Sequence, residues 1–228
     1  MPIFILTSDL KFPPVHLATP EGLLCVGGDL SPSRLLLAYQ SGIFPWYSDD
    51  EPILWWSPDP RLVLYPKELK ISRSLNKTIR KVGYRVTMDI CFQHTIESCA
   101  HAKRKEAHGT WITPEMAQAY ARLHEMGYAH SVETWYQGKI VGGLYGVSLG
   151  RCFFGESMFS IMPDASKVAL VALRNFLHDR NFKLIDCQLP TDHLIRMGAR
   201  KVSRKVFISE LNQSLQHPTL KGPWHLNS

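Results

Sequence analysis

Residues 129–160 read AHSVETWYQGKIVGGLYGVSLGRCFFGESMFS, and this stretch decides the fold class. It contains three strand-like segments: Ala129–Tyr136, Lys139–Leu149 and Arg151–Ser160. Only Gln137-Gly138 and Gly150 separate them, and connections this short are typical of antiparallel strands. The stretch therefore predicts an antiparallel meander.

Helices are expected on both sides of this meander. Before it, helical patterns cover residues 70–82 and about 92–102 around a strand at 84–88, and Thr113-Pro114-Glu115 begins a third helix. After it, helices are expected at about 164–179, 191–197 and 203–215, with a buried strand at 182–188. Helices packed on a mixed, mainly antiparallel sheet make an α+β domain.

The first 60 residues have a different character. They are rich in turn-forming residues, as in Thr19-Pro20-Glu21-Gly22 and Ser57-Pro58-Asp59-Pro60. One clear helix interrupts them, which Ser31 can cap and Gly42 can end. We expect a small N-terminal domain with few strands over residues 1–60 and a larger domain over residues 61–228.

The basic charge of the chain is concentrated in one region. The composition, 45% apolar and 20% charged over 228 residues, is that of a globular protein, with a net charge of +6. Residues 67–108 carry ten basic and four acidic side chains, which favours polyanion binding; a solvated surface is the alternative. Four cations would share one face of the helix expected at 70–82, with a spacing that suits successive phosphates: Arg73, Lys77, Arg80 and Lys81.

Several function classes lack their sequence signals. There is no GxxxxGK[ST] phosphate loop, no HExxH or CxxC…HxxxH spacing and no GxSxG elbow, so we expect no ATP, no metal and no cofactor. The five cysteines form no CxxC pair and several lie in apolar surroundings, which is typical of reduced thiols in the cytosol. No stretch approaches the roughly 18 apolar residues of a membrane span.

Tryptophans gather in the turn-rich N-terminal part. Trp46, Trp55 and Trp56 lie within eleven residues, and Trp111 stands alone in Gly109-Thr110-Trp111-Ile112. Exposed aromatic side chains can stack on nucleic-acid bases, at about 1–3 kcal/mol per base. Packing in the core or between domains is the alternative for each of them.

Three polar residues stand in strands that are otherwise apolar. In the segment Arg151–Ser160, alternation would place Glu156 and Met158 on one face. Glu156 would then be buried, and a buried carboxylate needs a partner or its pKa rises. Asp186 and Gln188, two residues apart at the end of a buried strand, would point the same way, either into a site or as turn caps.

Together these segments resemble the bacterial leucyl/phenylalanyl-tRNA–protein transferase family. The likeness covers roughly residues 20–200, with its motifs in the same order along the chain. The matching stretches are 22–24 (GLL), 27–32 (GGDLSP), 42–46 (GIFPW), 55–61 (WWSPDPR), 109–113 (GTWIT), 123–125 (LHE), 141–146 (VGGLYG), 155–160 (GESMFS), 165–167 (ASK) and 184–188 (LIDCQ).

The resemblance implies a larger domain similar to the GCN5-related N-acyltransferase fold beside the small N-terminal one. It also implies transfer of Leu, Phe or, less readily, Met from aminoacyl-tRNA to acceptor proteins that begin with Lys or Arg, which marks them for degradation. We therefore expect a cytoplasmic aminoacyltransferase that needs no cofactor, does not contact a membrane and acts as a monomer.

The resemblance suggests roles for Gln188 and Asp186, and the types and positions of other residues suggest theirs. Gln188 would contact the attacking amine, Asp186 would orient Gln188 or relieve developing positive charge, and Glu156 would hold this network or help recognise the positive acceptor. Trp46 and Trp111 would contact the terminal adenosine of the tRNA, and the basic helix would follow the tRNA backbone. The pocket for the amino-acid side chain is expected among five apolar residues: Leu144, Phe153, Met158, Leu170 and Ile185.

Two other functions remain open from the sequence. An acetyl-CoA-dependent N-acetyltransferase would need a Q/R-x-x-G-x-G/A loop before a helix, and none precedes the helix expected at 164. A non-catalytic RNA-binding module could be built on the basic helix and the tryptophans. Transfer of labelled Leu from Leu-tRNA to a peptide that begins with Lys or Arg separates all three readings.

Overall fold

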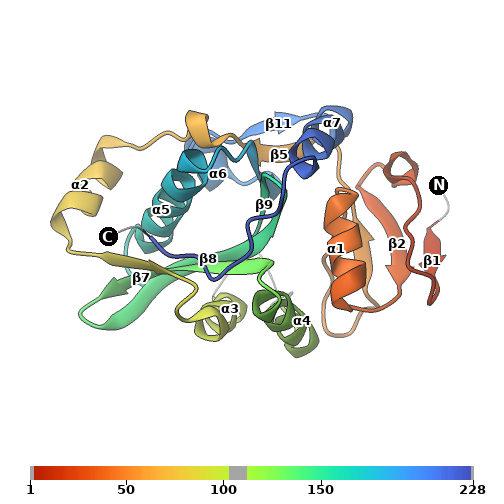
Figure 1. The fold of residues 1–228 in the computed structure, drawn as a ribbon, viewed down its shortest axis with the longest axis horizontal. Helices are drawn as coiled ribbons and strands as arrows, with labels where there is room; N and C mark the ends of the chain where they lie inside the picture. Colours follow the sequence, from red (N-terminus) through yellow and green to blue (C-terminus); the bar gives the residue numbers. More distant parts are fainter. Residues whose placement is uncertain (1–2, 103–111, 227–228) are drawn as a thin grey trace.

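The structure, a computed structural model, describes residues 3–102 and 112–226. These residues form two β-sheets with helices around them (Figure 1). The first sheet takes its strands from residues 4–56 and the second from residues 61–202. We propose the step from Pro60 to Arg61 as the domain boundary, because it falls between the last strand of one sheet and the first strand of the other.

The N-terminal sheet has the strand order β1-β2-β4-β3. Its elements are β1 (Phe4–Leu6), a 3-10 turn η1 (Val15–Leu17), β2 (Leu23–Gly27), β3 (Phe44–Pro45) and β4 (Leu54–Trp56). The sequence indicated few strands here and located none of these four, because segments of two to five residues are too short to show alternation.

The predicted helix of this domain is α1 (Pro32–Gln40). The Ser31 side chain accepts a hydrogen bond from the backbone N–H of Arg34, and Pro32 occupies the first turn, where a missing N–H leaves no bond unmade. Gly42 follows the helix with φ +72°, a left-handed conformation that glycine adopts without strain. Both predicted helix ends are confirmed.

The larger domain is built on a seven-stranded sheet with the order β11-β5-β10-β9-β8-β7-β6. The strands are β5 (Arg61–Leu64), β6 (Arg85–Met88), β7 (Ala129–Tyr136), β8 (Lys139–Leu149), β9 (Cys152–Ser160), β10 (Leu184–Gln188) and β11 (Arg200–Val202). Strands β7, β8 and β9 form the predicted antiparallel meander, and β9 pairs with β10 in parallel. The mixed, mainly antiparallel α+β architecture is therefore confirmed.

Helices cover both faces of this sheet (Figure 1). On one face α5 (Ala165–Asp179) packs on β7, β8 and β9; on the other, α3 (Phe92–Ala100) packs on the same strands and α4 (Pro114–Glu125) on β7. The remaining elements are η2 (Pro66–Glu68), α2 (Arg73–Lys81) against α5, α6 (Asp192–Arg196) after β10, and α7 (Arg204–Leu215) on β5 and β9. No helix in the described ranges is both long and apolar enough to cross a membrane.

Two apolar clusters form the core, one on each face of the large sheet. The cluster beneath α5 includes Leu144, Phe153 and Leu170. The cluster beneath α3, α4 and α7 continues into the N-terminal domain, where it includes Tyr39 and Phe44. The two domains therefore share one buried interior.

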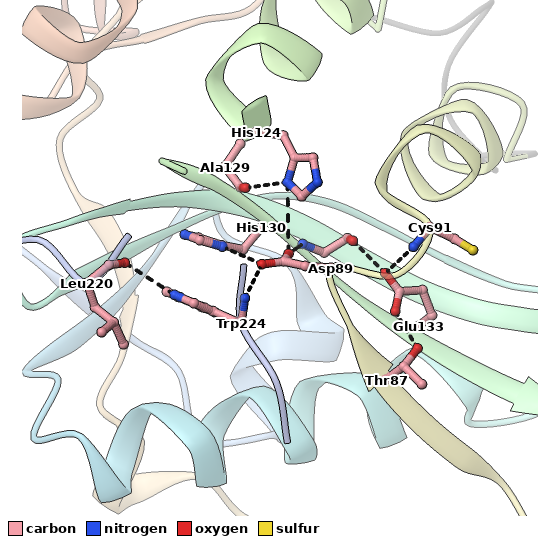
Figure 2. Close-up of polar contacts among 10 residues, drawn as sticks. Thr87, Asp89, Cys91, His124, Ala129, His130, Glu133, Leu220 and Trp224 are labelled. Carbon is pink, nitrogen blue, oxygen red and sulfur yellow. Dashed lines mark hydrogen bonds and ion pairs between the residues drawn. The ribbon is translucent and has the colours of Figure 1, made fainter. Parts of the chain in front are cut away.

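The C-terminal segment, residues 216–226, is fixed to the sheet by a buried carboxylate (Figure 2). Asp89, which follows β6, accepts hydrogen bonds from the backbone N–H of Trp224 at 2.6 Å and from Nδ1 of His130 at 2.9 Å. The Trp224 ring stacks on the His130 ring with a centroid distance of 3.6 Å. Trp224 is 2% exposed and belongs to the cluster beneath α5, so this segment completes that side of the core.

Candidate active site

The site lies where the parallel strands β9 and β10 stop pairing. Their three paired positions run from Leu184 opposite Cys152 to Asp186 opposite Phe154. Beyond this point the two strands share no further paired residues within the part of the chain that the structure describes. The side chains that follow still meet across the gap, because Nε2 of Gln188 donates a hydrogen bond to Oε1 of Glu156 at 2.7 Å.

A β-bulge in β9 determines which way Glu156 faces. The register of β9 on β8 shifts between Tyr145 and Gly146, which leaves Glu156 as an extra residue in the ladder. The prediction that Glu156 and Met158 share a face is wrong, because one extra residue reverses the facing of the residues after it. Met158 packs against the cluster beneath α5, whereas Glu156 is hydrogen bonded to Tyr120 of α4.

A buried network surrounds the Glu156 carboxylate. Tyr120 donates its hydroxyl to Oε2 of Glu156 at 2.9 Å, while Gln188 donates to Oε1. The hydroxyl of Tyr39, on α1, is hydrogen bonded to that of Tyr120. Both tyrosines are fully buried. The network therefore runs from the N-terminal domain to the end of β10.

This environment changes the proton affinity of Glu156. Burial raises the pKa of Glu156 from 4.5 to about 7, although hydrogen bonds from Tyr39, Tyr120 and Gln188 act in the opposite direction. Burial also raises the pKa of both tyrosines well above the ordinary value, so their hydroxyls stay protonated. Glu156 is therefore the group of this network that exchanges its proton near neutral pH.

Asp186 is engaged by a buried arginine. Arg61 of β5 donates to Oδ1 of Asp186 from Nε at 2.9 Å and to Oδ2 from Nη2 at 2.7 Å. Oδ1 also accepts the backbone N–H of Gln188 at 2.9 Å. Asp186 is fully buried. The Asp186 carboxylate thus binds the backbone N–H of Gln188, while the side-chain amide of Gln188 is hydrogen bonded to Glu156.

The five residues expected to line the amino-acid pocket lie in one cluster. Leu144, Phe153, Leu170 and Ile185 are at most 3% exposed and pack beneath α5. Met158 is half-buried at the edge of that cluster and lines a cavity of about 560 Å³ between the end of α3 and the start of α5. Of these five residues, Met158 borders that cavity, whereas the other four are packed in the core.

The tryptophans divide between core and surface. Trp55 is fully buried and donates its indole N–H to the carbonyl of Gly27, so core packing is the correct reading for this residue. Trp46 is 40% exposed, and its ring lies edge-on to the Trp56 ring at a centroid distance of 5.7 Å. The other tryptophan expected at the site, Trp111, lies outside the described residues.

Helix α2 keeps its predicted cations in solvent. Its buried side is formed by Leu75, which joins the cluster beneath α5. All four cations are exposed, and none takes part in an ion pair with another described residue: Arg73, Lys77, Arg80 and Lys81. All four cations are therefore available to a phosphate backbone.

Three residues around the site were not predicted from the sequence: Arg61, Tyr39 and Tyr120. The two tyrosines occupy helical positions that look like ordinary core, and Arg61 begins a strand that was not predicted, directly after a turn-rich segment. The burial expected for Glu156 implied hydrogen-bond donors around it. Nothing in the sequence indicated which residues supply them.

The expected likeness to GCN5-related N-acyltransferases is found at low similarity. A GCN5-related N-acetyltransferase from Kribbella flavida is 13% identical with a TM-score of 0.36, covering 75% of this chain and 61% of that one. The structure of L-PGS from Bacillus licheniformis is 11% identical with a TM-score of 0.41, covering 85% and 71%. Scores this low support no argument about activity.

Family and sequence matches are much closer. Residues 63–212 match the family described as leucyl/phenylalanyl-tRNA protein transferase, and residues 28–59 match the N-terminal domain of that family. Two proteins named leucyl/phenylalanyl-tRNA–protein transferase align over 224 residues. The one from Desulforapulum autotrophicum is 56% identical and covers 98% of both chains, and the one from Syntrophobacter fumaroxidans is 58% identical and covers 98% of this chain and 96% of its own. The chain therefore belongs to the leucyl/phenylalanyl-tRNA–protein transferase family, a family of aminoacyltransferases.

Proposed function

We propose that this aminoacyltransferase moves Leu or Phe, and less readily Met, from aminoacyl-tRNA to the N-terminal Lys or Arg of acceptor proteins. The new peptide bond marks the acceptor for degradation, and the chain acts in the cytoplasm as a monomer. Nearly full-length similarity to relatives named for transfer from tRNA to protein supports the proposal. The structural observation that carries it is the Gln188–Glu156 pair at the separated ends of β9 and β10.

The reaction does not require a strong acid or base from the protein. The donor is an ester and is already activated. An α-amine has an unperturbed pKa of about 7.7–8.0, so on the order of a tenth of it is neutral at pH 7. The site must hold that neutral amine against the ester carbonyl and stabilise the transition state. The amine loses one proton and the departing ribose oxygen gains one, so the proton balance closes within the substrates.

Gln188 has a suitable geometry for holding the amine. An ionised carboxylate only accepts hydrogen bonds, so Glu156 engages Nε2 of Gln188 and turns Oε1 of the amide away from itself. That oxygen accepts a hydrogen bond from the attacking amine. A neutral amide is a very poor base, so Gln188 positions the amine and does not take its proton.

We place the ligand where β9 and β10 stop pairing. There it would meet Glu156 and Gln188 on one face of the sheet and Met158 on the other. We assign the amino-acid side chain to the slot at Met158, whose flexible thioether suits Leu, Phe and Met. We assign the wall behind it to Leu144, Phe153, Leu170 and Ile185, because Met158 packs against the apolar cluster that contains them.

The tRNA is assigned to two surfaces. Trp46 and Trp111 contact its terminal adenosine. Trp46 is two residues from Phe44, whose ring centroid lies 4.7 Å from the guanidinium carbon of Arg61, and this proximity to the site supports the assignment. The cations on α2 follow the tRNA backbone: Arg73, Lys77, Arg80 and Lys81.

Transfer of labelled Leu from Leu-tRNA to a short peptide that begins with Arg tests the proposal. We expect labelled peptide, and none from an otherwise identical peptide that begins with Glu. Binding of Leu-tRNA without transfer to either peptide would support the RNA-binding module instead. Stabilisation against heat by CoA but not by Leu-tRNA would support an acetyl-CoA-dependent enzyme.

A further inference from the structure

Arg61 occupies an unusual position between the two domains. It is the first residue of β5, its side chain is 1% exposed, and its guanidinium lies between two aromatic rings. The guanidinium carbon is 4.7 Å from the ring centroid of Phe44, in the N-terminal domain, and 4.6 Å from that of Phe207, on α7. A cation removed from water in this way must gain from its partners what it loses in hydration.

Its partner is the carboxylate of Asp186, and the pair is bidentate. The two hydrogen bonds, at 2.9 and 2.7 Å, use both oxygens of Asp186, and the backbone N–H of Gln188 takes a further position on Oδ1. Because Asp186 is fully buried, a substrate does not reach this carboxylate. Asp186 therefore acts by positioning other groups and not by contacting the substrate.

The object of this positioning is the backbone of Gln188. Gln188 has φ +61°, in the left-handed region that residues with a side chain rarely adopt, and the register of β10 on β5 shifts between Asp186 and Gln188. The hydrogen bond from the Gln188 N–H to Asp186 holds this conformation. From it, the Gln188 side chain reaches Glu156 on the neighbouring strand.

We propose that Arg61 is a positioning residue for the transfer reaction. Arg61 fixes Asp186, Asp186 fixes the left-handed backbone of Gln188, and the Gln188 amide is thereby aimed at the acceptor amine. Because Phe44 of the N-terminal domain packs on the Arg61 guanidinium, both domains contribute to the position of the Gln188 side chain. The inference rests on the proposed function, because it assigns Gln188 to the amine.

The test compares Arg61→Gln and Arg61→Lys with a matched control, Arg34→Lys. Arg34 is also 1% exposed and pairs with an aspartate, Asp29, but its guanidinium donates its other hydrogen bonds to the carbonyls of Thr7 and Asp9, within the N-terminal domain. Transfer of Leu from Leu-tRNA to an Arg-starting peptide is measured below the melting temperature of each variant, with kcat and the KM for Leu-tRNA determined separately.

We expect Arg61→Gln to lower kcat roughly 10- to 100-fold while the KM for Leu-tRNA stays within about three-fold, because the loss is one of alignment. Arg61→Lys should recover part of kcat, since an ammonium keeps the charge but not the two-pronged geometry. Arg34→Lys should lose melting temperature and keep kcat. A wild-type kcat in Arg61→Gln, or an equal loss of kcat in Arg34→Lys, would overturn the inference.

If Arg61→Gln does not fold, the kcat of the double variant Arg61→Met/Asp186→Leu tests the inference instead. Replacement of a buried ion pair by apolar residues of similar volume is often tolerated. We expect this variant to be folded and to have the same kcat defect, because its Gln188 N–H has lost the acceptor that holds it. A folded double variant with wild-type kcat would overturn the inference. Absence of transfer by the wild-type chain would instead reject the proposed function itself.

Discussion

Glu156 combines a buried position with a pKa close to neutrality. Its carboxylate accepts from Tyr120 and Gln188, yet burial still dominates and raises the pKa from 4.5 to about 7. Between these two values the folded chain holds a proton that the unfolded chain has already lost. The ionised form that orients the Gln188 amide is therefore a destabilising form, by about 3 kcal/mol for a shift of this size.

This shift predicts how stability depends on pH. Since the folded pKa is raised, the contribution of Glu156 is fully present below pH 4.5 and is lost as the pH rises through 7. Glu156→Gln does not titrate, so between pH 5 and pH 8 its free energy of unfolding should gain about 2–3 kcal/mol relative to wild type. Urea titrations of both proteins at the two pH values measure this gain. A difference that does not change with pH would contradict the raised pKa.

Single residues could be located from the sequence, but their partners could not. Glu156, Asp186 and Gln188 stood out because polar side chains in apolar strands need an explanation. Arg61 lies 125 residues from Asp186 along the chain, and Tyr39 lies 81 residues from Tyr120. No local periodicity connects residues so far apart, so the donors around each carboxylate were visible only in the fold.

At the scale of elements, the helices and strands that could be predicted were those long enough to show a regular spacing of apolar residues. Strands β7 and β8 have the predicted bounds, and α5 begins one residue later than predicted. Strands β5 and β11 were missed because four and three residues carry too little alternation. The bulge at Glu156 was missed because it depends on the register of β9 against β8, which one strand alone does not encode.

Helix α2 carries a prediction of its own. Lys77→Ala/Arg80→Ala should weaken binding of Leu-tRNA. The slope of log K against log salt concentration should become less steep by about 0.7–0.9 for each phosphate that the helix no longer neutralises. Affinity measured between about 50 and 200 mM salt gives the slope. The exposed pair Lys183→Ala/Lys205→Ala removes the same charge elsewhere and should bind more tightly than the α2 variant. Equal slopes for the two double variants would show that α2 is only a solvated face.

At the scale of the whole molecule, the domains and the C-terminal segment depend on one another. The α+β class and the small N-terminal domain could be predicted, because the order of elements and the turn-rich composition determine them. The shared interior could not, because it depends on contacts between distant segments. Asp89 and Trp224, which anchor residues 216–226, are 135 residues apart.

The anchoring of this segment predicts a large effect of Trp224 on stability. Trp224 stacks on His130 and contacts Phe176 at a centroid distance of 4.7 Å, so Trp224→Ala leaves a cavity in the cluster beneath α5. We expect a loss of about 3–5 kcal/mol in the free energy of unfolding, measured in urea. Leu220→Ala, in the same segment and 37% exposed, is the control and should cost much less. Similar losses for both variants would contradict the proposed anchor.

The single-turnover rate of Gln188→Ala, with Leu-tRNA and an Arg-starting peptide, tests most directly whether this side chain positions the amine. We expect the rate to fall about 100-fold while the Kd for Leu-tRNA stays within about three-fold of wild type, because the amide aligns one reactant and does not hold the RNA. A wild-type rate in Gln188→Ala, or a loss of tRNA affinity as large as the loss of rate, would contradict the account.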